Sequence, residues 1–171
     1  MTTYPYLGVE GYQPGYQRGL ATIAETHRRR LAGLIGQRLT CAWLLWDSER
    51  DEWFADAPVL LEFDSEQVEV QHHKFDELSL TWNTVDPGGP VRFEDFDLCW
   101  RSDAAAILSG LQGQSVRQVS LLEWRGRDMA SGMVAVHLVF DEGQVTVYNA
   151  LDENGLSFDD PQPEYSWHRI G

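Results

Sequence analysis

The chain has 171 residues and a net charge of −14, because 27 acidic residues face 13 basic ones. Hydrophobic residues make up 43% of the chain and aromatic residues 12%, which is typical of a folded protein and argues against intrinsic disorder. The negative charge argues against binding to nucleic acid or to anionic membranes. The sequence has neither a signal-peptide pattern nor a long apolar run, so we expect a cytoplasmic protein.

The first half begins with an arm and a helix. Residues 1–16 are rich in Tyr and Pro and lack a helical or strand period, so we expect an arm that lies against the body. A helix is predicted from Arg18 to Ile35, and Gly36 suits the left-handed conformation that ends a helix. Apolar and alternating patterns then predict strands at residues 39–46, 58–63, 68–70 and 78–82.

The second half predicts the same elements in the same order. Turn-forming residues at 83–90 mark a linker that we place at about residues 83–102, with a short strand-like piece at 93–100. A short helix is predicted from Ala104 to Gly113, with Ser102 or Asp103 as its N-cap. Strands are predicted at 116–124, 133–140, 144–150 and 156–158, and the turn at 141–144 suits a tight hairpin. The tail, residues 159–171, is expected to be held against the body by its aromatic side chains.

An internal repeat relates the two halves. Residues 31–37 read L-A-G-L-I-G-Q and residues 108–114 read L-S-G-L-Q-G-Q, and the same shift of 77 positions carries Phe63-Asp64 onto Phe140-Asp141. We therefore predict repeat units at about residues 18–82 and 103–158. Each unit alone would be small, so we expect a single domain covering residues 1–171 with one shared core. The predicted fold class is α+β, with two tandem helix-plus-antiparallel-β-meander repeats.

Acidic residues interleaved with Trp suggest a surface for a basic partner. Residues 38–102 hold 5 basic and 15 acidic residues, a net charge of −10. Aromatic side chains supply buried contact area in interfaces, and carboxylates pair with Lys or Arg. The alternative is that the Trp residues belong to the core and the acids are a solvated surface. The candidate partner-binding residues are Asp47, Glu49, Asp51, Glu52, Trp53, Glu62, Glu69 and His73.

Other chemistry has weaker support in the sequence. His72 and His73 with Asp76 and Glu77 form the best local cluster for a metal or for acid–base work, but neighbouring residues of a strand point to opposite faces. No recognisable zinc-ligand spacing and no G-x-S-x-G motif is present. We therefore predict no metal, no cofactor and no catalytic residue.

In general character, the acidic, aromatic-rich and β-rich chain resembles the small immunity proteins that bacteria pair with secreted toxins. The resemblance implies a non-enzymatic protein that neutralises a basic toxin through its acidic face, with neither nucleic acid nor membrane as a partner. The alternative is a small-molecule-binding or hydrolytic domain with a pocket between the two repeats, lined by His72, His137 and Trp residues.

Overall fold

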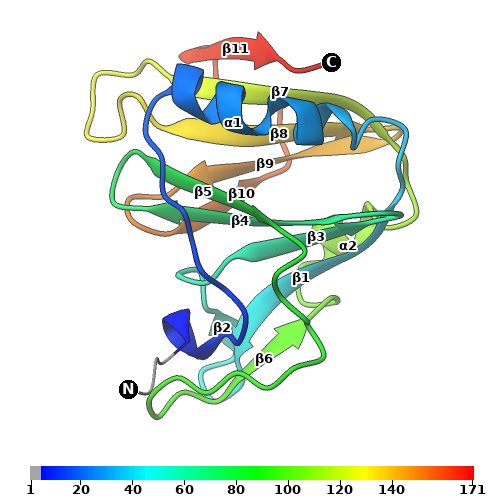
Figure 1. Cartoon of the computed structure of the whole chain (residues 1–171), viewed down its shortest axis with the longest axis vertical. Coiled ribbons are helices and arrows are strands. Elements are labelled where there is room, and N and C mark those ends of the chain that lie inside the picture. The colour runs from blue at the N-terminus through cyan, green and yellow to red at the C-terminus, as the bar shows by residue number, and fades with distance from the viewer. Residues whose placement is uncertain (1–4) are drawn as a thin grey trace.

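Two antiparallel sheets form the body of the protein (Figure 1). The computed structural model describes residues 5–171, so Tyr4 of the predicted arm lies outside the described residues. The first sheet has the order β2-β1-β3-β4-β5, with β6 also paired to β1, and the second has the order β10-β9-β8-β7-β11. The strands of the first sheet are β1 (Leu39–Asp47), β2 (Glu52–Trp53), β3 (Val59–Phe63), β4 (Gln67–His73), β5 (Glu77–Trp82) and β6 (Leu98–Arg101). Those of the second sheet are β7 (Val116–Trp124), β8 (Val134–Phe140), β9 (Gly143–Asn149), β10 (Asn154–Ser157) and β11 (Tyr165–Arg169).

The fold is mostly β, so the predicted α+β class is wrong. Strands make up 42% of the structure and helical residues 13%. The helices are α1 (Leu20–Ala32), α2 (Ala106–Gly110) and the 3-10 turn η1 (Tyr6–Gly8). The second predicted helix is reduced to a single short turn of 5 residues, and no side chain caps its N-terminus. Isolated helices this short are marginal, and the chain must turn at Gly113 (φ 89°) to enter β7.

Strand pairing recurs at the spacing of 77 residues that the sequence repeat has. Leu39 pairs with Phe63 between β1 and β3, and Val116 pairs with Phe140 between β7 and β8. Both pairs of strands carry a register irregularity directly after this first pair. The β3–β4 and β8–β9 hairpins also pair in registers that differ by 77. The two halves therefore share the backbone geometry of their central strands.

A further strand extends each unit beyond its predicted end. Leu45 of β1 pairs with Trp100 of β6, and the equivalent Leu122 of β7 pairs with Trp167 of β11. Residues 98–101 thus belong to the first sheet; they lie at the end of the predicted linker and overlap the strand-like piece predicted at 93–100. The shift is 67 at this strand, because the crossing segment before β11 (residues 158–164) is shorter than that before β6 (residues 83–97).

Each unit packs its helix against a strand of the other unit, at the interface between the two sheets that we call the seam. Helix α1 packs against β7 of the second unit, and α2 packs against β1 of the first. The Gly36 N–H donates to the Val116 carbonyl at 2.9 Å, and the equivalent Gly113 N–H donates to the Leu39 carbonyl at 2.7 Å. Buried apolar side chains from both sheets and both helices form one cluster that fills this seam.

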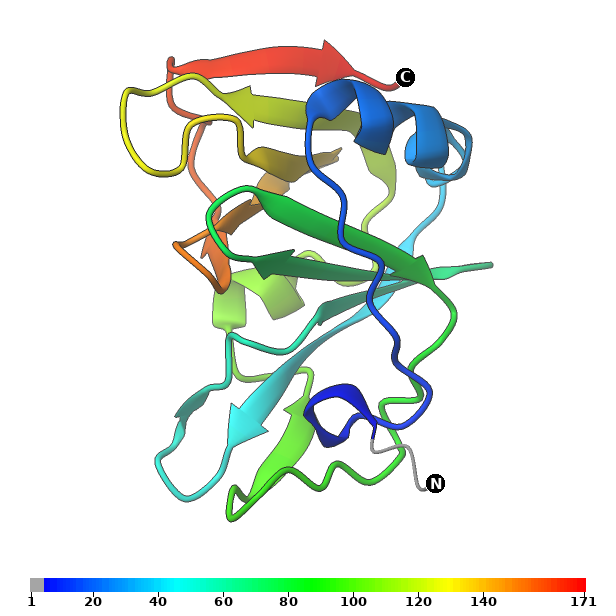
Figure 2. The same cartoon turned by 60° about the vertical axis from the view of Figure 1, so that its left-hand side comes forward.

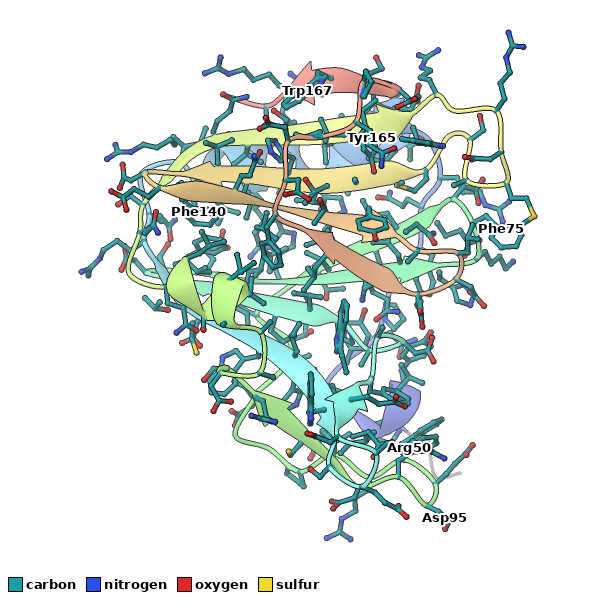
Figure 3. The ribbon with its side chains drawn as sticks, turned by 180° about the vertical axis from the view of Figure 1, so that it is seen from behind. Arg50, Phe75, Asp95, Phe140, Tyr165 and Trp167 are labelled. Atoms are coloured by element: carbon teal, nitrogen blue, oxygen red, sulfur yellow. The ribbon has the colours of Figure 1, made fainter. Side chains whose placement is uncertain are left out.

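The outer faces of the two sheets are covered differently. The N-terminal arm runs from α1 across the first sheet to η1 (Figure 2). It buries Val9 and Tyr12 in a second apolar cluster with Leu45 and Leu60. On the second sheet, the segment between β10 and β11 crosses the outer face (Figure 3).

Candidate functional site

The structure divides the acidic residues predicted to bind a partner among several places. Asp47 is 2% exposed, and it accepts hydrogen bonds from the backbone N–H groups of Glu49 and Arg50. The hydrogen bond from the Arg50 N–H is the main reason why the pKa of the Asp47 carboxyl lies below its usual range. Asp47 therefore shapes the β1–β2 turn and is not available to a partner. The remaining acids of the turn, Glu49, Asp51 and Glu52, are exposed at the end of the first sheet, where Figure 3 labels Arg50.

Glu69 is also removed from the predicted surface. Its side chain is 0% exposed beneath the arm and accepts hydrogen bonds from Thr81, Thr84 and Gln67. Such a saturated carboxylate has a structural role. His73 lies at the far end of β4, where it stacks on Tyr16.

The other predicted residues are half-buried and do not join the turn acids into one surface. Glu62 accepts a hydrogen bond from Trp43 Nε1 at 3.2 Å. Trp53 packs against the shared core. The eight residues predicted to bind a partner thus do not form a continuous patch, because two are buried and His73 lies at the other end of the sheet.

The two adjacent histidines occupy different environments. His72 is fully buried between the sheets, where its Nε2 donates to the Val147 carbonyl at 3.1 Å. Burial lowers the pKa of this imidazole to about 4, so it is neutral at neutral pH. His73 points outward and contacts Glu77. Among residues 5–171, no three His, Cys, Asp or Glu side chains are grouped as a metal site.

A large cavity lies on the outer face of the second sheet, and sequence reasoning did not find it. It has a volume of about 680 Å³ and lies between the β7–β8 loop and the crossing segment 158–164. Its walls carry the rings of Trp124, Tyr148 and Tyr165, and the first and last of these meet edge to face at 4.9 Å between ring centroids. Burial raises the pKa of Tyr165 to about 12, so its hydroxyl stays neutral.

The sheet itself makes room for these rings. Gly155 of β10 lies directly opposite Tyr148 of β9. A Cβ at position 155 would approach the Tyr148 ring to 2.4 Å, so the glycine lets this ring lie flat across the neighbouring strand. The residues that line the cavity all belong to positions 124–165, so it is a feature of the second unit and not of the seam between the repeats.

The charge around the cavity has a single sign. Three carboxylates line it, and none of the described lining residues is Lys or Arg. These carboxylates belong to Asp128, Asp159 and Asp160. None of them takes part in an ion pair within residues 5–171, whereas some acids elsewhere do, as Glu66 does with Arg30 at 2.7 Å. Their hydrogen-bond donors are neutral, as when Trp124 Nε1 donates to Asp128 at 2.9 Å. No ion pair among the described residues therefore compensates this negative charge.

The floor of the cavity contains a buried hydroxyl without a partner. Thr146 of β9 is 2% exposed and lines the cavity, and its Oγ1 has no hydrogen-bond partner among the described residues. Its neighbour His137 on β8 is 1% exposed and shares a hydrogen bond of 2.8 Å with Gln144, which in turn donates to Asp160. Burial lowers the pKa of His137. The crossing segment is thus fixed to the sheet, while the hydroxyl beside it remains free.

Exposed apolar side chains continue the site beyond its rim. Met129 and Leu151 line the cavity and are 64% and 48% exposed. Met129 also lines a second hollow of about 370 Å³, together with Phe75 and Asp152. Figure 3 labels Phe75, which is 42% exposed, at the edge of the molecule. Contiguous exposed apolar side chains beside a cavity commonly mark a binding surface.

Comparison of the chain with models of protein families, with curated proteins and with solved structures gave no match. Among the described residues, no helix is both long and apolar enough to cross a membrane. The candidate site therefore has to be interpreted from its own chemistry.

One sequence signal could have pointed to this cavity. Two outer-face positions change to aromatic residues between the units, Asp47 to Trp124 and Gln71 to Tyr148, whereas Trp43 changes to Ser120. A repeat that keeps its inward-facing residues but gains rings on its outer face indicates a new contact surface in the second unit.

Proposed function

We propose that this protein is a non-enzymatic acidic binding protein that holds a positively charged side chain of a basic partner in the cavity of the second sheet. Immunity to a basic toxin is the biological setting that we propose for it, supported by the net charge of −14 and the aromatic fraction of 12%. The partner would approach an acidic surface, which speeds the encounter of oppositely charged proteins.

The observation that carries the proposal is the uncompensated charge of the cavity. Its three carboxylates lack ion pairs among the described residues, and its walls are aromatic. A cation over the face of a Trp or Tyr ring is attracted by the ring quadrupole, and carboxylates at the rim add a direct charge interaction. The apolar stem of a Lys or Arg side chain matches the ring-lined walls.

The alternative of a pocket between the repeats has no support at that place. The seam is filled by buried apolar side chains of both sheets, and His72 makes its hydrogen bond inside that packing. His137 lies on the outer face of the second sheet, on a different side of that sheet from the seam. A small cationic molecule in the cavity described above remains an outcome that the experiments can reveal.

The proposal is tested with a minimal cation and its neutral counterpart. The n-butylammonium ion and 1-butanol are titrated into labelled protein at low salt, and the indole N–H signal of Trp124 and the amide signal of Thr146 are followed by NMR. We expect the ammonium ion to shift both signals more strongly than the alcohol does, and added salt to weaken its binding.

Two triple variants provide matched charge changes. The variant D128N/D159N/D160N is expected to lose ammonium binding, because it removes the negative charge of the cavity. The variant E94Q/D95N/D97N removes three charges from the exposed part of segment 83–97 and should bind as the wild type does. Equal responses to the alcohol and the ammonium ion, or equal losses in the two variants, would contradict the proposal.

A further inference from the structure

The outer face of the first sheet is equivalent to the face of the second sheet that contains the cavity. What covers the first face therefore indicates what kind of ligand covers the second. The two faces present equivalent positions: Leu45 matches Leu122, Gln67 matches Gln144, and Glu69 matches Thr146 in the 77-residue register. Only the first face is fully covered by the chain itself.

An extended segment that lies outside the repeat covers the first face. Tyr12 of the arm is 3% exposed and packs with Leu45. The Gly15 N–H donates to Ser79 Oγ at 3.0 Å, and Gln17 pairs with the β5 edge residue Leu78 through two backbone hydrogen bonds. The arm therefore contributes an aromatic anchor and backbone hydrogen bonds, as extended peptides do when they bind beside a sheet.

The long crossing segment completes the cover of the first face. The Thr84 N–H donates to Glu69 at 3.2 Å, and Gln67 donates to the Val85 carbonyl at 2.7 Å. The polar side chains of this face thus bind the backbone of the segment above them.

The second face lacks both parts of this cover. No arm crosses it among the described residues, and its crossing segment spans only residues 158–164. Gln144 still reaches that segment through Asp160, but Thr146, at the position of Glu69, has no partner in the described chain. The cavity of about 680 Å³ is therefore the space that extended chain fills on the first face.

From this comparison we infer that the cavity binds an extended peptide segment of the basic partner, in the place that the arm takes on the first sheet. The inference rests on the proposed function in one respect, the positive charge of the peptide segment. A Lys or Arg of the segment enters beside Asp159 and Asp160, and its backbone hydrogen-bonds with Thr146 Oγ1. The segment continues over Met129 toward the hollow that contains Phe75.

The exposed rim favours a peptide over a small cation. Met129 lines both hollows and Phe75 lines only the second, so a ligand that only fills the cavity leaves the apolar side chains of the second hollow in water. A peptide that crosses the rim covers them and gains the apolar contact area.

The test compares a peptide with a single capped residue. The peptide is a capped Gly/Ser nonapeptide with a central Tyr-Lys-Tyr, and the single residue is Nα-acetyl-lysine methylamide. Dissociation constants are measured by NMR titration, with the Thr146 amide reporting on the cavity. We expect the peptide to bind at least about ten times more tightly than the capped lysine, because it also covers the rim.

Variants of the rim separate the peptide from the single residue. Phe75→Ser should weaken peptide binding about five-fold and leave the capped lysine within about two-fold, since Phe75 lines the second hollow and not the cavity. Ile107→Ser is the matched control, because Ile107 is 62% exposed and lines neither hollow. It should change neither affinity.

The outcomes are distinguishable. Equal affinity of the two ligands would overturn the peptide inference and leave the cation-binding function standing, and so would a peptide that shifts signals only at the β1–β2 turn. Failure of both ligands to bind would overturn the inference and the proposed function together.

Discussion

Gln37 and Gln114 make the same two hydrogen bonds in the two halves of the molecule. Gln37 Nε2 donates to the Gly33 carbonyl at 2.8 Å, and its Oε1 accepts from the Ser65 N–H at 3.1 Å. Gln114 does the same with Gly110 at 3.2 Å and Glu142 at 2.7 Å. Each side chain thus ties the end of its helix to the hairpin turn of its own unit, and the glutamine of the G-Q pair in each repeat has this structural role.

Loss of either glutamine should therefore have a similar effect. We expect Gln37→Ala and Gln114→Ala each to lower the free energy of unfolding by about 1 kcal/mol, because each removes two largely exposed hydrogen bonds. Urea unfolding measures both. Gln162→Ala is the control, since no hydrogen bond of that side chain is found among the described residues, and it should have little effect. A large loss from one variant and none from the other would contradict the equivalence.

Glu69 and Thr146 occupy equivalent positions but should respond oppositely to substitution. Glu69→Ala leaves several buried donors without an acceptor, including Thr81 Oγ1 and Gln67 Nε2, so we expect a loss of about 3 kcal/mol or more. Thr146→Val keeps the shape of the side chain and removes an unpartnered hydroxyl, so its effect should lie within about 1 kcal/mol and be stabilising. Urea unfolding of both variants is the measurement. A strongly destabilised Thr146→Val variant would show that the hydroxyl is satisfied in the free protein.

The buried His72 should make the fold sensitive to acid. Its pKa is lowered by burial from 6.5 to about 4, so the unfolded chain binds more protons than the folded one between these values. Stability is then fully present above the unfolded pKa and falls as the pH drops toward the folded pKa, by about 3 kcal/mol for this residue.

A variant at this position isolates the contribution. His72→Gln keeps an amide donor for the Val147 carbonyl and removes the titration, so the loss of stability between about pH 7 and about pH 4 should be smaller than in the wild type. His27 and His137, whose pKa values are also lowered by burial, supply a background of the same direction in both proteins. Identical pH profiles of the wild type and the variant would contradict the assignment to His72.

The arm should contribute strongly to stability through Tyr12. Tyr12→Ala removes a ring that is 3% exposed, and we expect a loss of about 3–5 kcal/mol of unfolding free energy. Tyr12→Phe should cost less than about 0.5 kcal/mol, because the hydroxyl has no hydrogen-bond partner among the described residues. Tyr148→Ala in the half-open cavity should cost only about 1 kcal/mol. Chemical unfolding measures the loss of unfolding free energy in the three variants. An equal loss from Tyr12→Ala and Tyr148→Ala would show that the two outer faces are equally covered.

The sequence carries much of the strand framework and little of the site. The starts of the predicted strands at 39 and 116 match β1 and β7, because the inward-facing residues of the two units follow the same pattern. The fold class failed at residues 104–113, where an Ala-rich stretch favours helix locally but only Ala106–Gly110 becomes helical before the turn at Gly113. The strand-like piece predicted at 93–100 overlaps β6, but its pairing with β1, a strand far away in sequence, is not contained in a local pattern.

The cavity depends on tertiary geometry that local patterns do not contain. Its rings come from β7, β9 and β11, and the path of residues 158–164 across the sheet decides that they meet. The burial of Glu69 was not foreseen for the same reason, because it depends on the path of the arm and of the long crossing segment.

The salt dependence of peptide binding tests the central claim most directly. The Tyr-Lys-Tyr nonapeptide is titrated calorimetrically into the wild type and into D128N/D159N/D160N, at low salt and at about 0.5 M salt. We predict that salt weakens binding to the wild type about ten-fold, and that the variant binds weakly at both salt concentrations. Tight binding that responds neither to salt nor to the loss of these three carboxylates would contradict the claim that the cavity recognises a positive charge.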